Sequence, residues 1–170
     1  MYTGIETRSG RLMDFITPDP KVFSIRDIGH ALAQTNRFNG HARFPYSVAQ
    51  HSVYASMMAP VKLKLQALMH DAHEAYVGDM PTPLKELLPG YKAAELVMEE
   101  ALRKHFDLPL MFDPIVKIID TRLLVTEAKA LGFRWWPNIQ ADPYPFKIEP
   151  WSWEQARDRF IDRYWELTGF

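Results

Sequence analysis

A histidine and an aspartate stand side by side at positions 70 and 71, inside the largely apolar stretch LMHDAHEAYVGDM. An imidazole and a carboxylate in such surroundings need polar partners, because burying an unpaired polar group is costly. The pair can be a hydrogen-bonded structural dyad, or it can supply two ligands to a metal ion. Further polar residues in apolar surroundings favour the second interpretation.

Two such residues occur elsewhere in the chain. His51 lies within SVAQHSVYASMM, and Asp120 lies within KIIDTRLL. Together with His70 and Asp71 they give two imidazoles and two carboxylates, a mixed nitrogen and oxygen set that suits one divalent transition metal, whether Co²⁺, Mn²⁺, Fe²⁺, Ni²⁺ or Zn²⁺. Four protein ligands on a six-coordinate ion would leave positions for water and substrate.

The order of these residues resembles the H…HD…D signature of the HD-domain metal-dependent phosphohydrolases. The span from about residue 36 to 129 is similar to the nucleotide-cleaving branch of that superfamily, on the motifs NRF (36–38), HDAHE (70–74), GDMPTPLK (78–85) and KIID (117–120). The likeness is to bacterial deoxynucleoside 5'-monophosphate nucleotidases and to phage dATP triphosphohydrolases. It implies a compact HD-domain helical bundle that removes phosphate from a 5'-deoxynucleotide, with monophosphate and triphosphate both open as substrates.

The expected ligands are His51, His70, Asp71 and Asp120, and Mg²⁺ on the substrate phosphates is a further option. Glu74 follows the His-Asp pair by one helical turn and shares its face. It is the expected group for moving a proton during hydrolysis, which the resemblance supports. The alternative for Glu74 is an exposed helix carboxylate.

Fixed cations must meet the negative charge on a transferring phosphoryl group. Arg37, Lys85 and Lys117 are the candidates, although each lysine can equally be a solvated surface charge. Phe38 is expected to stack on a base. Asp79 is expected either to bond a sugar hydroxyl or to cap a turn.

The elements that must position these residues are expected to be helices. Hydrophobic spacing and capping signals predict them over 25–35, 47–58, 61–77, 91–106 and 114–133. A capping box formed by Ser152 and Gln155 predicts a terminal helix to about residue 165. Residues 1–23 are expected to form a short hairpin or extended arm, and the proline- and aromatic-rich segment 134–151 to pack over the body. The sequence therefore predicts one all-α domain over residues 1–170.

The composition excludes several classes of protein. The 170 residues carry a net charge of -1 and no cysteine, which disfavours duplex nucleic acid as a partner and excludes thiolate chemistry. No run of about 18 apolar residues and no signal peptide is present, so we expect a cytoplasmic protein without a membrane partner. The tryptophans around 134–151, Trp135 and Trp136 among them, favour packing or subunit contact, and hence a homo-oligomer.

Three other functions remain open. A di-metal HD enzyme, such as a phosphodiesterase or oxygenase, would need more ligands before Asp120, where His105 and His73 are the available imidazoles. A catalytically silent nucleotide-binding or regulatory HD module would not need Glu74 and both lysines. A structural zinc site is usually a closed cage rich in cysteine, and this chain has none.

Overall fold

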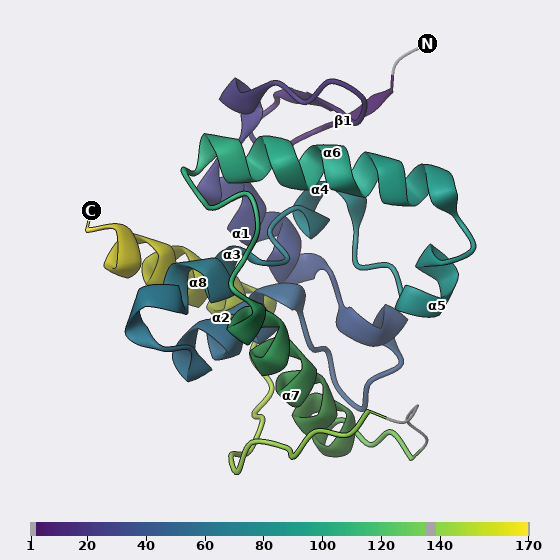
Figure 1. Ribbon diagram of the computed structural model, residues 1–170, viewed down its shortest axis with the longest axis vertical. Helices are drawn as coiled ribbons and strands as arrows, with labels where there is room; N and C mark the ends of the chain where they lie inside the picture. The colour runs from purple at the N-terminus through teal and green to yellow at the C-terminus, as the bar shows by residue number, and fades with distance from the viewer. Residues whose placement is uncertain (1–2, 135–138, 170) are drawn as a thin grey trace.

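The computed structural model describes residues 3–134 and 139–169, and most of this part of the chain is helical (Figure 1). The α-helices, in chain order, are α1 (Ile25–Gln34), α2 (Val48–Met58), α3 (Lys64–Met69), α4 (Glu74–Val77), α5 (Thr82–Lys85), α6 (Pro89–His105), α7 (Pro114–Ala130) and α8 (Trp153–Thr168). Single 3-10 turns are η1 (Pro20–Val22), η2 (Arg37–Gly40) and η3 (Val61–Leu63). A mostly helical architecture is therefore confirmed. None of the helices in the described ranges is long and apolar enough to cross a bilayer.

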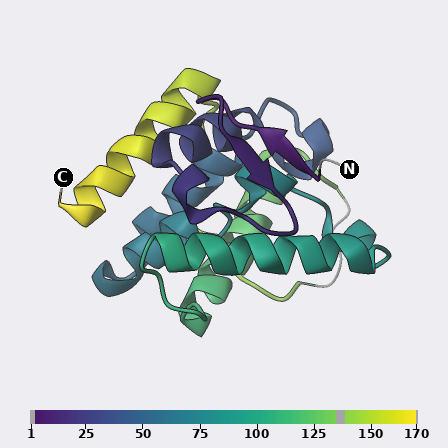
Figure 2. The same cartoon turned by 90° about the horizontal axis from the view of Figure 1, so that it is seen from above.

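The N-terminal arm forms the expected hairpin. Strands β1 (Gly4–Glu6) and β2 (Leu12–Asp14) pair antiparallel, with Ile5 opposite Met13. Gly10 has a φ of +76° in the turn between them, a conformation that glycine adopts without steric cost. Met13 is fully buried and anchors the hairpin in the core, and both views place the hairpin beside α6 (Figures 1 and 2).

Helix α2 is the central element of the bundle. Its residues from Val48 to Ser56 are all buried, so it lacks the polar stripe of a surface helix. A hydrophobic cluster that includes Ile28 of α1 and Phe160 of α8 covers one side. A second cluster, which includes Leu123 of α7, covers the other. Close packing on both sides fixes α2, and with it the side chain at position 51.

The prediction of a single helix over residues 61–77 is wrong. The chain forms η3, α3 and α4 there, with a turn at residues 70–73. Within this turn the amide of Ala72 donates to Met69 O (3.1 Å) and that of Glu74 to Asp71 O (3.0 Å), which are i to i+3 bonds. The backbone at His70 keeps right-handed helical angles (φ -62°, ψ -34°). The spacing of residue types through this turn therefore still predicts a helix. The His-Asp pair therefore lies just beyond the C-terminus of α3.

The two long C-terminal helices begin where the sequence predicts. The Asp113 side chain accepts a hydrogen bond from the Ile115 amide (2.9 Å), and Pro114 occupies the first position of α7, where its missing N–H is not needed. At α8, the amide of Gln155 donates to Ser152 Oγ (3.2 Å) while the Ser152 amide donates to Gln155 Oε1 (3.0 Å). The capping box is thus confirmed.

Residues 139–152, which precede α8, are irregular, as expected, and pack on the body of the protein. Ile148 is buried. The rings of Phe146 and Trp151 lie 5.1 Å and 5.2 Å from the ring of Tyr54 on α2. Trp135 and Trp136, for which packing or subunit contact was expected, lie outside the described residues.

Candidate metal centre

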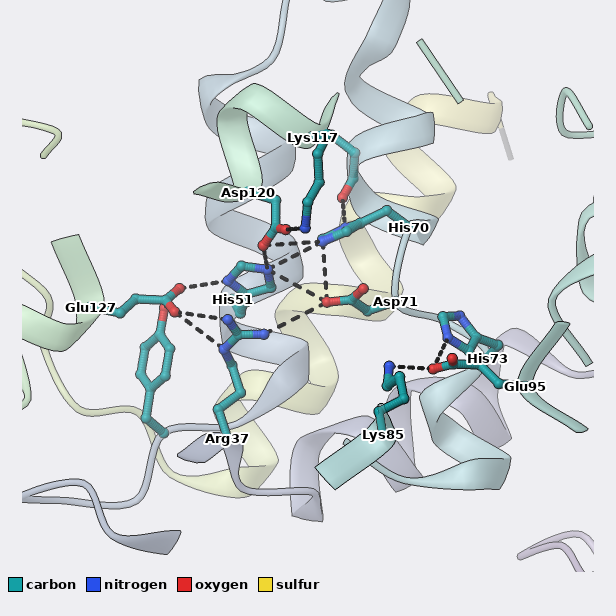
Figure 3. Close-up of polar contacts among 12 residues, drawn as sticks. Arg37, His51, His70, Asp71, His73, Lys85, Glu95, Lys117, Asp120 and Glu127 are labelled. Atoms are coloured by element: carbon teal, nitrogen blue, oxygen red, sulfur yellow. Dashed lines mark hydrogen bonds and ion pairs between the residues drawn. The ribbon is translucent and has the colours of Figure 1, made fainter. Parts of the chain in front are cut away.

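Three elements converge at one point of the bundle. His51 comes from α2, His70 and Asp71 from the turn after α3, and Asp120 from α7 (Figure 3). Nε2 of His51 lies 3.2 Å from Nε2 of His70 and 3.3 Å from Oδ1 of Asp120. Oδ2 of Asp71 lies 3.1 Å from His70 Nε2 and 3.6 Å from His51 Nε2. All four expected ligand residues thus belong to a single group, in which each carboxylate lies next to both imidazoles.

The separations suit a shared cation. Nitrogen and oxygen ligands lie about 2.0–2.2 Å from a zinc-sized ion, which places neighbouring ligand atoms about 3–4 Å apart. Ligand atoms of His51, His70 and Asp120 all lie within 4.8 Å of one another. Asp71 is not part of that mutually close set, but its carboxylate touches both imidazoles. The donor set can therefore hold a divalent ion with His51, His70 and Asp120 as ligands and Asp71 beside them.

Hydrogen bonds fix both imidazole rings in the form that a metal ligand requires. His70 Nδ1 donates to the carbonyl oxygen of Ala67 (2.8 Å), which can only accept. His51 Nδ1 donates to Oε1 of Glu127 (2.5 Å). A neutral ring protonated at Nδ1 presents an Nε2 lone pair. The two Nε2 atoms face each other, so their lone pairs need a cation or protons between them.

Glu127 is a member of the candidate site that the sequence prediction missed. It is completely buried on α7 and accepts hydrogen bonds from Tyr46 Oη (2.9 Å) and Arg37 Nε (3.2 Å) as well as from His51. Burial alone would raise the pKa of Glu127, but the charge of Arg37, followed by that of His51, lowers it. A sequence signal existed, since Glu127 follows Asp120 by two helical turns and so shares its face of α7.

Arg37 contacts two carboxylates, those of the buried Glu127 and the partly exposed Asp71. Only 8% of the residue is exposed, and its Nη1 lies 3.6 Å from Asp71 Oδ2 while Nη2 lies 3.1 Å from Glu127 Oε2. Burial opposes its charge, but Glu127, followed by Asp79 and Asp71, raises the pKa of Arg37. The Arg37 guanidinium therefore connects the Glu127 carboxylate, which accepts from His51, with the Asp71 carboxylate, which lies beside His70.

The carboxylates determine the charge of the two imidazoles. Burial and Arg37 oppose protonation of His51, yet Glu127 and Asp120 raise its pKa. Burial likewise opposes protonation of His70, but Asp71 and then Asp120 raise its pKa well above the ordinary value. Without a bound ion, the surrounding carboxylates thus favour a second proton on each ring more than water does.

Glu74 lies at the start of α4 beside this group. It is 7% exposed, so it is not an exposed helix carboxylate. Its Oε2 is buried and has no hydrogen-bond partner among the residues that the structure describes. Burial, followed by the charges of Asp71 and Asp79, raises the pKa of Glu74 well above its usual range. With His70, Asp71 and Asp120 it lines a cavity of about 300 Å³.

The two lysines expected to meet phosphate also line this cavity. The Lys117 side chain is 79% exposed, and its Nζ donates to Oδ2 of Asp120 (2.6 Å). Lys85 Nζ donates to Oε1 of Glu95 (2.5 Å), and Nε2 of His73 lies 3.4 Å from the same oxygen. Neither Glu95 nor the proximity of His73 to it was predicted from the sequence.

The remaining two expected substrate residues lie near Arg37. Phe38 occupies η2 with a φ of +57°, an uncommon conformation for a residue with a side chain. Its ring packs against that of Phe133 with centroids 4.8 Å apart. Burial, opposed by Arg37 and reinforced by Asp71, raises the pKa of Asp79. Neither residue is among those lining the 300 Å³ cavity in the described part of the chain.

The fold and the site define a helical protein with a buried histidine and carboxylate centre open to a small cavity. No family model matches the chain. It is similar to the uncharacterized protein YfdR of Escherichia coli (strain K12), with 38% identity over 171 residues, 96% of this chain and 95% of the relative. The uncharacterized protein RCAP_rcc00048 of Rhodobacter capsulatus is 34% identical over 119 residues, covering 64% of this chain and 61% of the relative. The chain belongs to the family of YfdR.

Proposed function

We propose that this protein is a divalent-metal-dependent phosphohydrolase of the HD-domain type that removes phosphate from a 5'-deoxynucleotide. The observation that carries the proposal is the convergence of two Nδ1-anchored imidazoles and Asp120 on one point. That point borders a cavity lined also by Glu74, whose Oε2 has no hydrogen-bond partner among the described residues. The order of these residues in the chain, described above, supports the HD type.

The metal would be held by His51, His70 and Asp120, with Asp71 beside them. When bound, a divalent ion neutralises charge on a phosphoryl oxygen and lowers the pKa of a water molecule. Arg37 and Glu127 hold the ligands from behind, because the guanidinium touches Asp71 and the glutamate accepts from His51. This support keeps the imidazoles in their binding tautomer.

Glu74 would carry the proton in this reaction. Its raised pKa brings protonation closer to neutral pH, where a carboxyl group can both donate and accept a proton. Its Oε2, which has no hydrogen-bond partner in the described chain, would give the proton to the leaving oxygen of the nucleotide or take one from the attacking water. Lys85 and Lys117, on the cavity wall, would orient the phosphate.

A single metal suits the site better than a pair. In residues 3–134 and 139–169, the group of His51, His70 and Asp120 is the only one with three or more close metal-ligating side chains. His73 lies near Glu95, but Lys85 already occupies the contacted oxygen of that carboxylate. This arrangement favours a one-metal hydrolase over a di-metal phosphodiesterase or oxygenase.

The test is turnover by purified protein on a panel of deoxynucleoside mono- and triphosphates in Mn²⁺, Co²⁺ or Mg²⁺. The released species, orthophosphate or tripolyphosphate, is identified. We expect Asp120→Asn to abolish release and Asp162→Asn, an exposed aspartate on α8, to leave it unchanged. Thermal unfolding of both variants controls for folding. Turnover that survives in Asp120→Asn refutes the ligand assignment, and metal binding without any turnover favours a silent nucleotide-binding module.

A further inference from the structure

Lys85, Glu95 and His73 form a second polar group on the cavity wall, apart from the group around His51 (Figure 3). Oε1 of Glu95 accepts from Lys85 Nζ at 2.5 Å and lies 3.4 Å from Nε2 of His73. The side chains of Glu95, Lys85 and His73 are only 15%, 21% and 9% exposed. Tyr91 adds a ring contact, with Lys85 Nζ 5.7 Å from its centroid. Glu95 thus holds Lys85 in a partly desolvated ion pair.

The second lysine of the cavity is also matched by a carboxylate. Lys117 Nζ lies 2.6 Å from Asp120 Oδ2. Because a phosphate would have to compete with Glu95 for Lys85 and with Asp120 for Lys117, neither ammonium group offers unmatched charge. Arg37, the third expected cation, is committed to Glu127 and Asp71.

The charge of the whole cavity leads to the same conclusion. Leaving Glu74 aside, its described lining holds five carboxylates and two lysines: Asp71, Glu95, Glu99, Asp113 and Asp120 against Lys85 and Lys117. A divalent ion adds two positive charges, and Arg103 pairs with Glu99. Positive and negative charges are then equal, five of each, before any substrate enters. Within the part of the chain that the structure describes, the cavity lining has no surplus cation for a chain of phosphates.

We propose that this cavity selects 5'-monophosphates against 5'-triphosphates, and that Glu95 is the residue that determines the selection. This inference rests on the proposed function. A phosphate monoester carries about 1.5 to 2 negative charges near neutral pH, which is the smaller addition to a cavity whose charges are already balanced. A triphosphate brings more negative charge next to the Glu95 carboxylate, and like charges in a partly desolvated site repel strongly. Discrimination thus comes from a repulsive element in the site.

The decisive variant is Glu95→Gln, which keeps the shape of the side chain, removes its charge and frees Lys85. We measure kcat/KM for the mono- and triphosphate of the same deoxynucleoside, with the metal at a fixed concentration. We expect the wild type to favour the monophosphate, and the variant to raise the ratio of triphosphate to monophosphate by about tenfold, as the loss of one close like charge predicts. Glu86→Gln is the matched control, because Glu86 is 62% exposed and pairs with Lys92 outside the cavity lining.

A second measurement does not depend on turnover. Tripolyphosphate and orthophosphate are titrated into the metal-loaded protein by calorimetry, and Glu95→Gln should strengthen tripolyphosphate binding by about the same factor while orthophosphate binding changes little. Thermal unfolding confirms that the variant is folded. The inference is overturned if the wild type prefers the triphosphate. It is also overturned if Glu95→Gln changes the ratio of triphosphate to monophosphate kcat/KM by less than about twofold. Either result leaves the proposed function standing. Absence of turnover with every nucleotide overturns both.

Discussion

Glu127→Gln is the sharpest test of how the buried network supports the candidate metal centre. The three hydrogen-bond partners of Glu127 in the described chain are all donors: Arg37 Nε, Tyr46 Oη and His51 Nδ1. Glutamine has nearly the same shape but offers one acceptor oxygen and turns an NH₂ group toward donors. At least one charge-assisted bond is therefore lost, and Arg37 keeps only Asp71 at 3.6 Å as a described ion-pair partner.

Two magnitudes follow from these contacts. Loss of a buried hydrogen bond to a charged group should cost about 1.5–3 kcal/mol of unfolding free energy. For a chain of this size each kcal/mol lowers Tm by about 2–4 °C, so a fall of about 3–12 °C is expected. Removal of the carboxylate that orients a metal-binding histidine should weaken metal affinity by about 10- to 100-fold, equivalent to about 1.4–2.8 kcal/mol.

The assay is calorimetric titration of Co²⁺ or Mn²⁺ into chelator-treated protein, with thermal unfolding in parallel. Glu166→Gln is the matched control, because Glu166 is 66% exposed and pairs with Arg163 on the surface of α8. A variant that loses stability but binds metal within about twofold of wild type refutes the reasoning. Glu127 would then be a partner for Arg37 alone, with no role in orienting His51.

Two further predictions concern pH and the surface lysine. The pKa values of His51 and His70 are raised in the folded protein without an ion. Protonation of these two residues therefore stabilises the fold fully at a pH below about 6.5, the pKa of histidine in the unfolded chain. This stabilisation is lost as the pH rises through the pKa values of the folded protein. The Tm of protein treated with a chelator should therefore fall between about pH 6 and pH 9, while the increase in Tm on adding Mn²⁺ grows over the same range. Scanning fluorimetry that gives parallel curves of Tm against pH with and without Mn²⁺ contradicts this. Lys117→Gln removes an ammonium group that is 79% exposed, so unfolding free energy should change by less than about 1 kcal/mol. If Lys117 orients phosphate, KM in steady-state kinetics should rise, and an unchanged KM argues for a surface charge only.

The sequence predicted the helices that carry His51 and Asp120 because the starts of these helices are marked locally. Ser47 accepts a hydrogen bond from the Gln50 amide at the start of α2, and Asp113 with Pro114 begins α7. Such signals act within a few residues and can be read from the chain alone. They place His51 and Asp120 at defined positions on two long helices, which the structure then packs together.

The parts that the sequence did not predict depend on contacts between distant residues. Arg37 and Glu127 are 90 residues apart, and Tyr46 and Glu127 are 81 apart. Nothing next to Arg37 distinguishes an arginine that binds phosphate from one that neutralises a buried carboxylate. The break of the 61–77 segment was missed for a related reason, since only the hydrogen-bonding pattern changes there while the backbone stays close to helical.

The charges of the centre explain why these distant contacts belong together. Asp71, Asp120 and Glu127 bring three negative charges into the bundle, and the described buried ion pairs set Arg37 against Glu127 and Asp71. Lys117 contacts Asp120, but its side chain is 79% exposed, where solvent weakens such a pairing. Two positive charges are therefore still needed inside the bundle, and they can arrive as one divalent ion or as a second proton on each of His51 and His70. The raised pKa of both imidazoles reflects the second solution. Because a metal and these protons would compete for the same two Nε2 atoms, a centre built this way gains metal affinity as pH rises, whereas a hydrogen-bonded dyad with no affinity for metal would not.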